Sequence, residues 1–78
     1  MPTLTKWGAD WCSSCEALEP TLDRLENEGY TVIRMDVEQS PEEAKAAGVR
    51  TIPAIFIDGV RFTLPPLYFN LKGALDAG

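Results

Sequence analysis

The residues with the clearest chemical potential in this sequence are its only two cysteines, Cys12 and Cys15. Their spacing lets the two thiols close into a small disulfide ring or open to a dithiol. A cysteine at a helix N-terminus ionises more readily, because unpaired backbone N–H groups and the helix dipole stabilise the thiolate. We therefore expect Cys12 to attack a substrate disulfide and Cys15, one turn further along and more buried, to resolve the mixed disulfide.

Three other interpretations of the cysteine pair stay open. Zinc takes four ligands, so a chain with two cysteines and no histidine could hold zinc or an iron–sulfur cluster only between two copies. The thiols could be buried and inert, although Asp10, Ser13 and Ser14 favour an exposed edge. The domain could also be a redox-inactive binding module. A purely structural staple is disfavoured, because so short a closed loop removes little unfolded-state entropy.

The composition is that of one small acidic domain, expected to span residues 1–78. A formal net charge of −5 argues against a nucleic-acid partner, because nucleic-acid-binding proteins carry basic faces. No stretch is apolar enough to cross a membrane, and the first residues lack a signal-peptide pattern. We therefore expect a cytoplasmic monomer, in which an isolated cysteine pair of this kind is more often catalytic or metal-binding than structural.

Hydrophobic spacing predicts the elements that position the cysteine pair. A first strand is expected over residues 3–7, and a helix should begin at or just after Cys12. Pro20 falls inside this helix and should kink it about two turns in, before the helix ends at residues 27–29. Residues 30–37 form the clearest strand of the sequence.

A short second helix is expected after that strand. Ser40 should be its N-cap and Pro41 its first residue, with Glu43 closing a capping box. Gly48 should end the helix.

The C-terminal third predicts a hairpin followed by a last helix. Residues 54–57 and 60–64 are apolar runs on either side of Asp58 and Gly59, a strong turn signal. The prolines at 65–66 should start the final helix, with three leucines on one face: Leu67, Leu71 and Leu75.

The predicted order of elements is β-α-β-α-β-β-α. A strand–helix–strand unit gives a parallel crossover, and the hairpin adds an antiparallel pair. The expected fold is α/β, with a four-stranded mixed sheet and helices on both faces. Chemistry in such sheets gathers at the carboxyl ends of the parallel strands, where Cys12 would lie.

Several of these features together resemble the thioredoxin/glutaredoxin superfamily, and thioredoxins in particular. Trp11 directly precedes the first cysteine, Pro20 stands where the family kinks its active-site helix, and residues 48–53 match the family's segment before its cis-proline. Residues 36–41 resemble the turn after the family's next strand. The resemblance covers roughly residues 5–60 and implies a minimal thioredoxin fold, because thioredoxins carry a further strand and helix before this point.

The resemblance also implies roles for residues around the cysteines. Pro53 would be cis and pack beside Cys12, while Ile52 would offer backbone groups to an extended substrate chain. Trp11 would form an apolar lip beside the nucleophile. The two residues between the cysteines, Ser13 and Ser14, would tune the redox potential.

The chain departs from thioredoxins just upstream of the pair. Lys6 stands where they carry a buried aspartate, Gly8 where they carry an aromatic residue, and Arg34 where they often place a lysine. Lys6 is therefore expected either to favour the thiolate electrostatically, as a tuning residue, or to extend its ammonium group to solvent.

The function implied by the resemblance is reduction of protein disulfides by dithiol exchange, without a bound cofactor or metal. An electron donor like thioredoxin reductase would restore the dithiol, and ribonucleotide reductase is a candidate recipient. One alternative is a glutathione-dependent glutaredoxin, although residues 62–66 lack the glycine pair of that family. The other is a dimer that bridges a metal or cluster and acts as a carrier or sensor.

Overall fold

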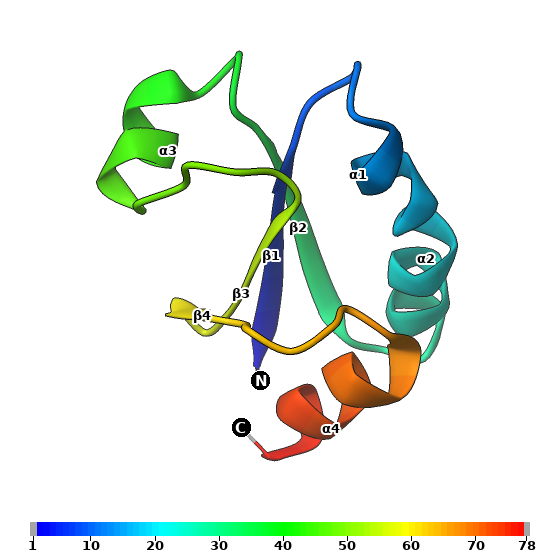
Figure 1. Cartoon of the computed structure of the whole chain (residues 1–78). Helices are drawn as coiled ribbons and strands as arrows, with labels where there is room; N and C mark the ends of the chain where they lie inside the picture. Colours follow the sequence, from blue (N-terminus) through cyan, green and yellow to red (C-terminus); the bar gives the residue numbers. More distant parts are fainter. Residues whose placement is uncertain (1, 78) are drawn as a thin grey trace.

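The computed structural model describes residues 2–77, in which strands and helices alternate around one open sheet (Figure 1). In chain order the elements are β1 (Thr3–Gly8), α1 (Ser13–Ala17), α2 (Glu19–Asn27), β2 (Thr31–Asp36), α3 (Pro41–Ala46), β3 (Ala54–Ile57), β4 (Val60–Arg61) and α4 (Tyr68–Ala77).

The sheet has the strand order β2-β1-β3-β4, so β1 lies inside it. β1 runs parallel to β2, with Thr3 opposite Thr31, and antiparallel to β3, with Trp7 opposite Ala54. The turn between β3 and β4 contains Asp58 and Gly59, both with positive φ, which is the backbone of a tight hairpin turn that matches the strand twist. The predicted α/β class, mixed sheet and hairpin are confirmed.

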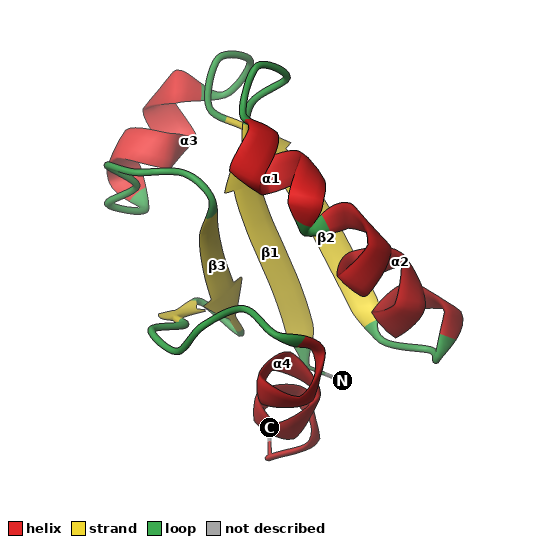
Figure 2. Ribbon diagram, turned by 45° about the vertical axis from the view of Figure 1, so that its right-hand side comes forward, coloured by secondary structure: helices red, strands yellow, loops and turns green. Residues whose placement is uncertain are grey.

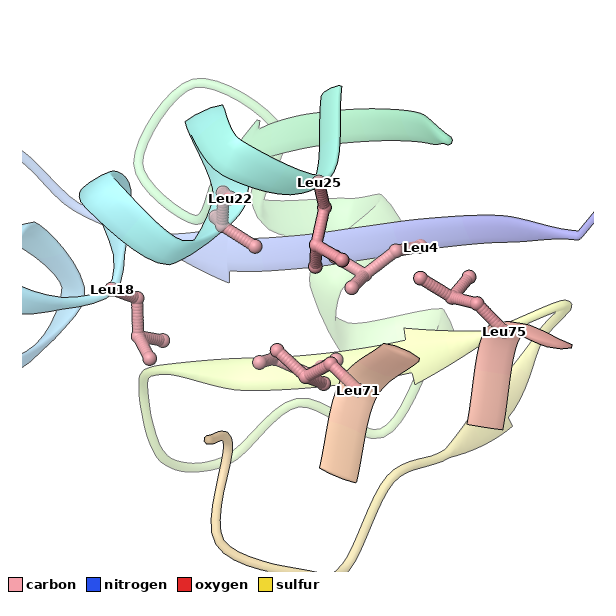
Figure 3. Packing of buried hydrophobic residues seen from close by; sticks show 7 residues of the cluster. Leu4, Leu18, Leu22, Leu25, Leu71 and Leu75 are labelled. Atoms are coloured by element: carbon pink, nitrogen blue, oxygen red, sulfur yellow. The ribbon is translucent and has the colours of Figure 1, made fainter. Parts of the chain in front are cut away.

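Helices cover both faces of the sheet, as predicted (Figure 2). Side chains alternate along each strand, so each face of the sheet has its own core. Leucines of α2 and α4 pack on Leu4 and Ile55 at one face (Figure 3), and Ala44 of α3 packs on Trp7 and Phe56 at the other. None of the helices within residues 2–77 has the length and apolar character needed to cross a membrane.

The kink expected at Pro20 is a break between two helices. Leu18 ends α1 and precedes α2, and Pro20 occupies the first turn of α2. Proline has no N–H to donate to the preceding turn, so the chain restarts its helical hydrogen bonds here. The first hydrogen bond of α2 runs from the Leu22 N–H to the carbonyl of its N-cap, Leu18, at 3.0 Å. The break therefore separates α1, whose N-cap and first turn hold the cysteines, from α2, whose Leu22 and Leu25 are buried.

The capping box predicted for α3 is wrong. Ser40 is the N-cap and Pro41 the first helical residue, but the Ser40 side chain makes no capping hydrogen bond. The backbone N–H of Ser40 donates to the Asp36 carbonyl at 2.9 Å, so the donor that Glu43 would have satisfied is already paired. Gly48 follows the helix with a φ of +77°, as expected of the residue that ends it.

The structure also corrects the C-terminal boundaries. β4 ends at Arg61 rather than residue 64, and α4 begins at Tyr68 rather than at the prolines. Pro66 has no N–H, and the first helical bond of α4 runs from the Leu71 N–H to the Leu67 carbonyl, 3.0 Å long. Leu67 therefore flanks the helix instead of facing the core, and its side chain is 63% exposed.

Candidate active site

The cysteine pair lies where the chain leaves β1 and enters α1. Cys12 is the N-cap of α1, and Cys15 is inside its first turn. The two are joined by a disulfide, with their Cα atoms 5.2 Å apart, a separation that suits such a bridge. The Cys12 Sγ atom also accepts a hydrogen bond from the Cys15 backbone N–H at 3.1 Å. The first turn of the helix therefore already offers a donor to the sulfur that would carry negative charge.

Both cysteines are buried while the bridge is closed. Cys15 is 2% exposed and Cys12 is 7% exposed, so the order of burial matches the expectation, but Cys12 is not on an exposed edge. The sulfur of Cys12 is turned back over the helix toward the Cys15 N–H, which explains its low exposure. The flanking Ser13 and Ser14 are exposed. The exposed surface next to the pair therefore consists of these serines and of Asp10 and Trp11 in the loop that precedes them.

Trp11 is the prominent apolar group of that loop. Its side chain is 69% exposed, and its indole Nε1 donates to the Glu38 Oε1 atom at 2.6 Å. Glu38 belongs to the turn after β2, where the Asp36 carboxylate accepts from the Glu38 backbone N–H at 2.7 Å. Figure 1 shows the β1–α1 and β2–α3 loops at the same end of the molecule. The sequence singled out Trp11 but carried no signal for Glu38 as its partner.

Ile52 and Pro53 lie at the same edge of the sheet as the cysteine loop. They come directly before Ala54, the residue of β3 that pairs with Trp7 near the end of β1. The peptide bond between them is cis. Beside Pro53 is a small hollow of about 90 Å³, which is otherwise lined by Ile55, Phe62, Leu64 and Pro66. Apolar residues thus line this hollow, and the cis peptide bond lies at the edge of the sheet where β1 ends.

Lys6 does not extend to solvent, so that alternative is wrong. Its side chain points from β1 to the α1–α2 face of the sheet, is 8% exposed as a residue, and its Nζ atom lies 2.7 Å from the Glu19 Oε2 atom. The other oxygen of Glu19 accepts from Arg34 Nε at 2.7 Å. Arg34 in turn reaches Asp23 and Glu26 on the outer face of α2. One carboxylate on α2 thus holds the cations of two neighbouring strands.

This ion-pair network borders a cavity that extends to Cys15. The cavity has a volume of about 290 Å³, and Lys6, Cys15, Glu19 and Arg34 are among the residues that line it. Gly8 is also in the lining, and a Cβ atom there would come within 3.1 Å of the Cys15 Sγ atom. The missing side chain at Gly8 therefore keeps this space open beside the Cys15 sulfur. Sequence reasoning missed Glu19 as a residue of this site. The signal that could have found it is its spacing, because residues four apart in a predicted helix, such as Cys15 and Glu19, lie on the same side of it.

The network changes the ionisation of Glu19. Burial on its own would raise the pKa of this carboxyl group, but the hydrogen bonds and charges of Lys6 and Arg34 outweigh burial and hold the pKa below its ordinary value of 4.5. The same contacts act in the opposite direction on Arg34. Burial on its own would lower the pKa of its guanidinium, and the bonds to Glu19 and Glu26 raise it. Glu19 is thus an anion throughout the neutral range.

We predict that Glu19 makes folding stability depend on acidity. A carboxyl group with a depressed pKa in the folded state stabilises fully above its unfolded pKa of about 4.5, and this contribution is lost as the pH falls through the lower folded value. Glu19→Gln should reduce the free energy of unfolding by about 1 kcal/mol at neutral pH. Urea unfolding of the variant and the parent protein should show that the difference between their free energies of unfolding becomes smaller as the pH falls below the unfolded pKa and through the folded pKa of Glu19.

Glu43→Gln is the matched control, because Glu43 is exposed on α3 and away from this network. If the free energy of unfolding of Glu19→Gln differs from that of the parent protein by a constant amount down to acid pH, the result would contradict the pairing seen in the structure.

Metal-ligating side chains are sparse around the site. Across residues 2–77, no three histidine, cysteine, aspartate or glutamate side chains gather in a way that could hold a metal ion.

The family model for thioredoxin matches residues 1–61 of the chain. The chain belongs to the thioredoxin family. It is 30% identical over 60 residues to a thioredoxin of Rickettsia conorii and 33% identical over 57 residues to one of Listeria monocytogenes. These alignments cover 73% and 69% of this chain but only 57% and 55% of the two relatives. The chain therefore spans little more than half the length of the curated thioredoxins it matches.

The fold agrees with this membership. The structure of a point-mutant thioredoxin from Halobacterium salinarum superposes with a TM-score of 0.81 at 29% sequence identity. That comparison covers 97% of this chain and 73% of the archaeal protein. The predicted thioredoxin-like architecture is therefore confirmed. In the described sheet, β2 is an edge strand.

Proposed function

We propose that this protein is a thiol–disulfide oxidoreductase that reduces protein disulfides through Cys12 and Cys15. The observation that carries the proposal is the pair itself, which is joined across the first turn of α1 in a member of the thioredoxin family. The closed ring, the Cys12–Cys15 disulfide, is the oxidised form of the pair in a dithiol cycle. A donor would open the ring to the dithiol, and the dithiol would pass two electrons to a substrate disulfide as the ring closes again.

The cycle begins at Cys12. Its thiolate attacks one sulfur of the substrate disulfide, and the second substrate sulfur leaves as a thiolate that takes a proton. Cys15 then loses its proton and attacks the Cys12 Sγ atom, which releases the other substrate sulfur. The products are a substrate dithiol and the Cys12–Cys15 disulfide. A donor dithiol restores the starting state by the same exchange in reverse.

The hydrogen bond at the N-cap supports Cys12 as the nucleophile. The Cys15 N–H that lies 3.1 Å from the Cys12 sulfur would stabilise its thiolate, because charge-assisted hydrogen bonds are stronger than neutral ones. Cys15 is more deeply buried, which suits a thiol that reacts only with its neighbour.

The residues at this edge of the sheet would hold the substrate chain. Trp11 would provide an apolar contact beside the nucleophile, and Ile52 would pair its backbone with an extended segment of substrate. Pro53 has no N–H that could compete for the thiolate, while Ser13 and Ser14 would set the redox potential. Support comes from the exposure of the Trp11 indole and from the register that brings the Ile52–Pro53 segment to this edge.

The partners would be cytoplasmic protein disulfides and a reductase of the thioredoxin-reductase class, with ribonucleotide reductase as a candidate recipient. The match to the thioredoxin family supports a protein substrate over glutathione. A glutathione-dependent reaction and a metal-bridged dimer are the competing outcomes of the test below.

Insulin reduction tests this function. The wild-type protein should reduce insulin disulfides with thioredoxin reductase and NADPH as the electron source, and much more slowly with glutathione and glutathione reductase. The same preparation, purified without oxygen, should have the mass of one chain and contain no stoichiometric zinc or iron. Insulin turnover that depends on glutathione alone, or a metal-bearing dimer without reductase activity, would overturn the proposal.

A further inference from the structure

Lys6 is the one charged residue that is buried within residues 2–77. A buried ammonium group is costly without partners, and here Glu19 supplies one at 2.7 Å. An ammonium group has three donors, so this contact leaves donors of Lys6 available to the cavity that it lines. A buried cation beside a solvent-filled space can stabilise negative charge that forms there.

The Cys15 sulfur lies close enough for this effect. A Cβ atom placed on Gly8 would be 3.1 Å from the Cys15 Sγ atom and 3.3 Å from the Lys6 Cε atom. Both side chains therefore border the space that a side chain at Gly8 would have filled. Cys12 is not in the cavity lining, whereas Cys15 is. The cation thus acts on the resolving thiol more than on the nucleophile.

The other charges around the cavity are weaker influences on Cys15. Asp10 and Glu16 are exposed, so water and salt screen them. The Asp36 carboxylate accepts backbone hydrogen bonds from its own turn. Arg34 is bound by three carboxylates on α2. Lys6, buried and opposed mainly by Glu19, is therefore the least screened charge that faces the sulfur.

We propose that Lys6 stabilises the thiolate of Cys15 as it resolves the mixed disulfide, and that Glu19 is the counter-charge that limits this effect. This role rests on the proposed function, in which Cys15 must lose a proton before it attacks Cys12. The thiol proton leaves to solvent through the cavity.

Glu19 is poorly suited to be the base itself. Both of its oxygens accept hydrogen bonds from cations, and its pKa is held below the ordinary carboxyl value. A carboxylate so stabilised accepts a thiol proton less readily than water-exposed carboxylates do. Its effect on Cys15 is therefore electrostatic and opposite in sign to that of Lys6.

The test isolates Cys15 by titrating its thiol in a Cys12→Ser background, where it is the only cysteine. Thiolate absorbance and the rate of alkylation by iodoacetamide should both report its titration midpoint. Adding Lys6→Met should raise the midpoint by about one pH unit, because the cation is lost. Adding Glu19→Gln should lower it by about half a unit, because glutamine can still accept from Lys6 but no longer opposes its charge.

Lys6→Arg and Lys45→Met are the controls. Lys6→Arg keeps the positive charge and should leave the midpoint within about 0.3 units of the parent. If Lys6→Met does not fold, the lowered midpoint expected in Glu19→Gln carries the test. Lys45 is exposed on α3, and its replacement should change nothing. An unchanged midpoint in Lys6→Met, a shift of about one unit in Lys6→Arg, or a rise in Glu19→Gln would overturn the proposal. These titrations involve no substrate, so their failure is distinct from a failure of insulin reduction.

Discussion

Cys12→Ser should abolish insulin reduction, with a loss of at least about a thousandfold in the rate. A serine hydroxyl is not ionised at neutral pH, and an oxygen cannot form the mixed disulfide through which the electrons pass. The N-cap contact can be kept, because serine is a favourable N-cap residue and its oxygen can accept from the Cys15 N–H. The loss should therefore appear in turnover without loss of the fold, as measured by circular dichroism.

Cys15→Ser separates the roles of the two thiols. Cys12 should still attack, but nothing resolves the product, so the protein should accumulate as a mixed disulfide with its substrate. Mass spectrometry of the reaction mixture, or gel electrophoresis without reducing agent, would detect this adduct. Normal turnover by Cys15→Ser would indicate a monothiol mechanism and contradict the assignment of Cys15 as the resolving thiol.

Leu71→Ala should reduce the free energy of unfolding by about 3 kcal/mol. Leu71 is fully buried between α4 and the sheet, in the cluster with Leu4 and Leu22 (Figure 3). Truncating it removes apolar contacts and leaves a cavity in a core with few spare residues. Small domains have total stabilities on the order of 5 kcal/mol, so this single change should bring the protein close to unfolding at physiological temperature. Urea denaturation with the disulfide intact would measure it.

Leu67→Ala is the matched control for Leu71→Ala. The sequence places both leucines on one helical face, but in the structure Leu67 precedes α4 and is mostly exposed. Its replacement should change the free energy of unfolding by no more than about 0.5 kcal/mol. A cost at Leu67 similar to that at Leu71 would mean that the helix starts earlier and buries Leu67.

Most of the fold could be predicted from local patterns. The spacing of leucines in residues 18–25, the alternation in the strands and the turn at Asp58 and Gly59 each depend on neighbouring residues, and the structure confirms the elements they predict. The boundaries that failed depend on hydrogen bonds whose partners the pattern does not show. The capping box at Ser40 failed because a backbone carbonyl had already taken the donor.

The residues of the candidate site also divide into those that the sequence reveals and those that only the structure reveals. Cys12 and Cys15 could be identified from their spacing, and Trp11 and Pro53 from the family resemblance. Glu38 as the partner of Trp11, and Glu19 as the partner of Lys6, could not be found in this way. Each pair joins separate elements, and such contacts depend on how one element packs against another.

The sequence alone determined that this chain carries an exchangeable thiol pair at the start of a helix, on a small α/β sheet. That much follows from residue types and short-range geometry. Only the tertiary structure decided the environment of Lys6. Glu19, the first residue of α2, pairs with Lys6 of β1, and the missing side chain of Gly8 leaves space in a cavity that both Lys6 and Cys15 line. The Lys6 ammonium group, which could have pointed to water, is buried in the cavity beside Cys15, and its partner there is a carboxylate of α2.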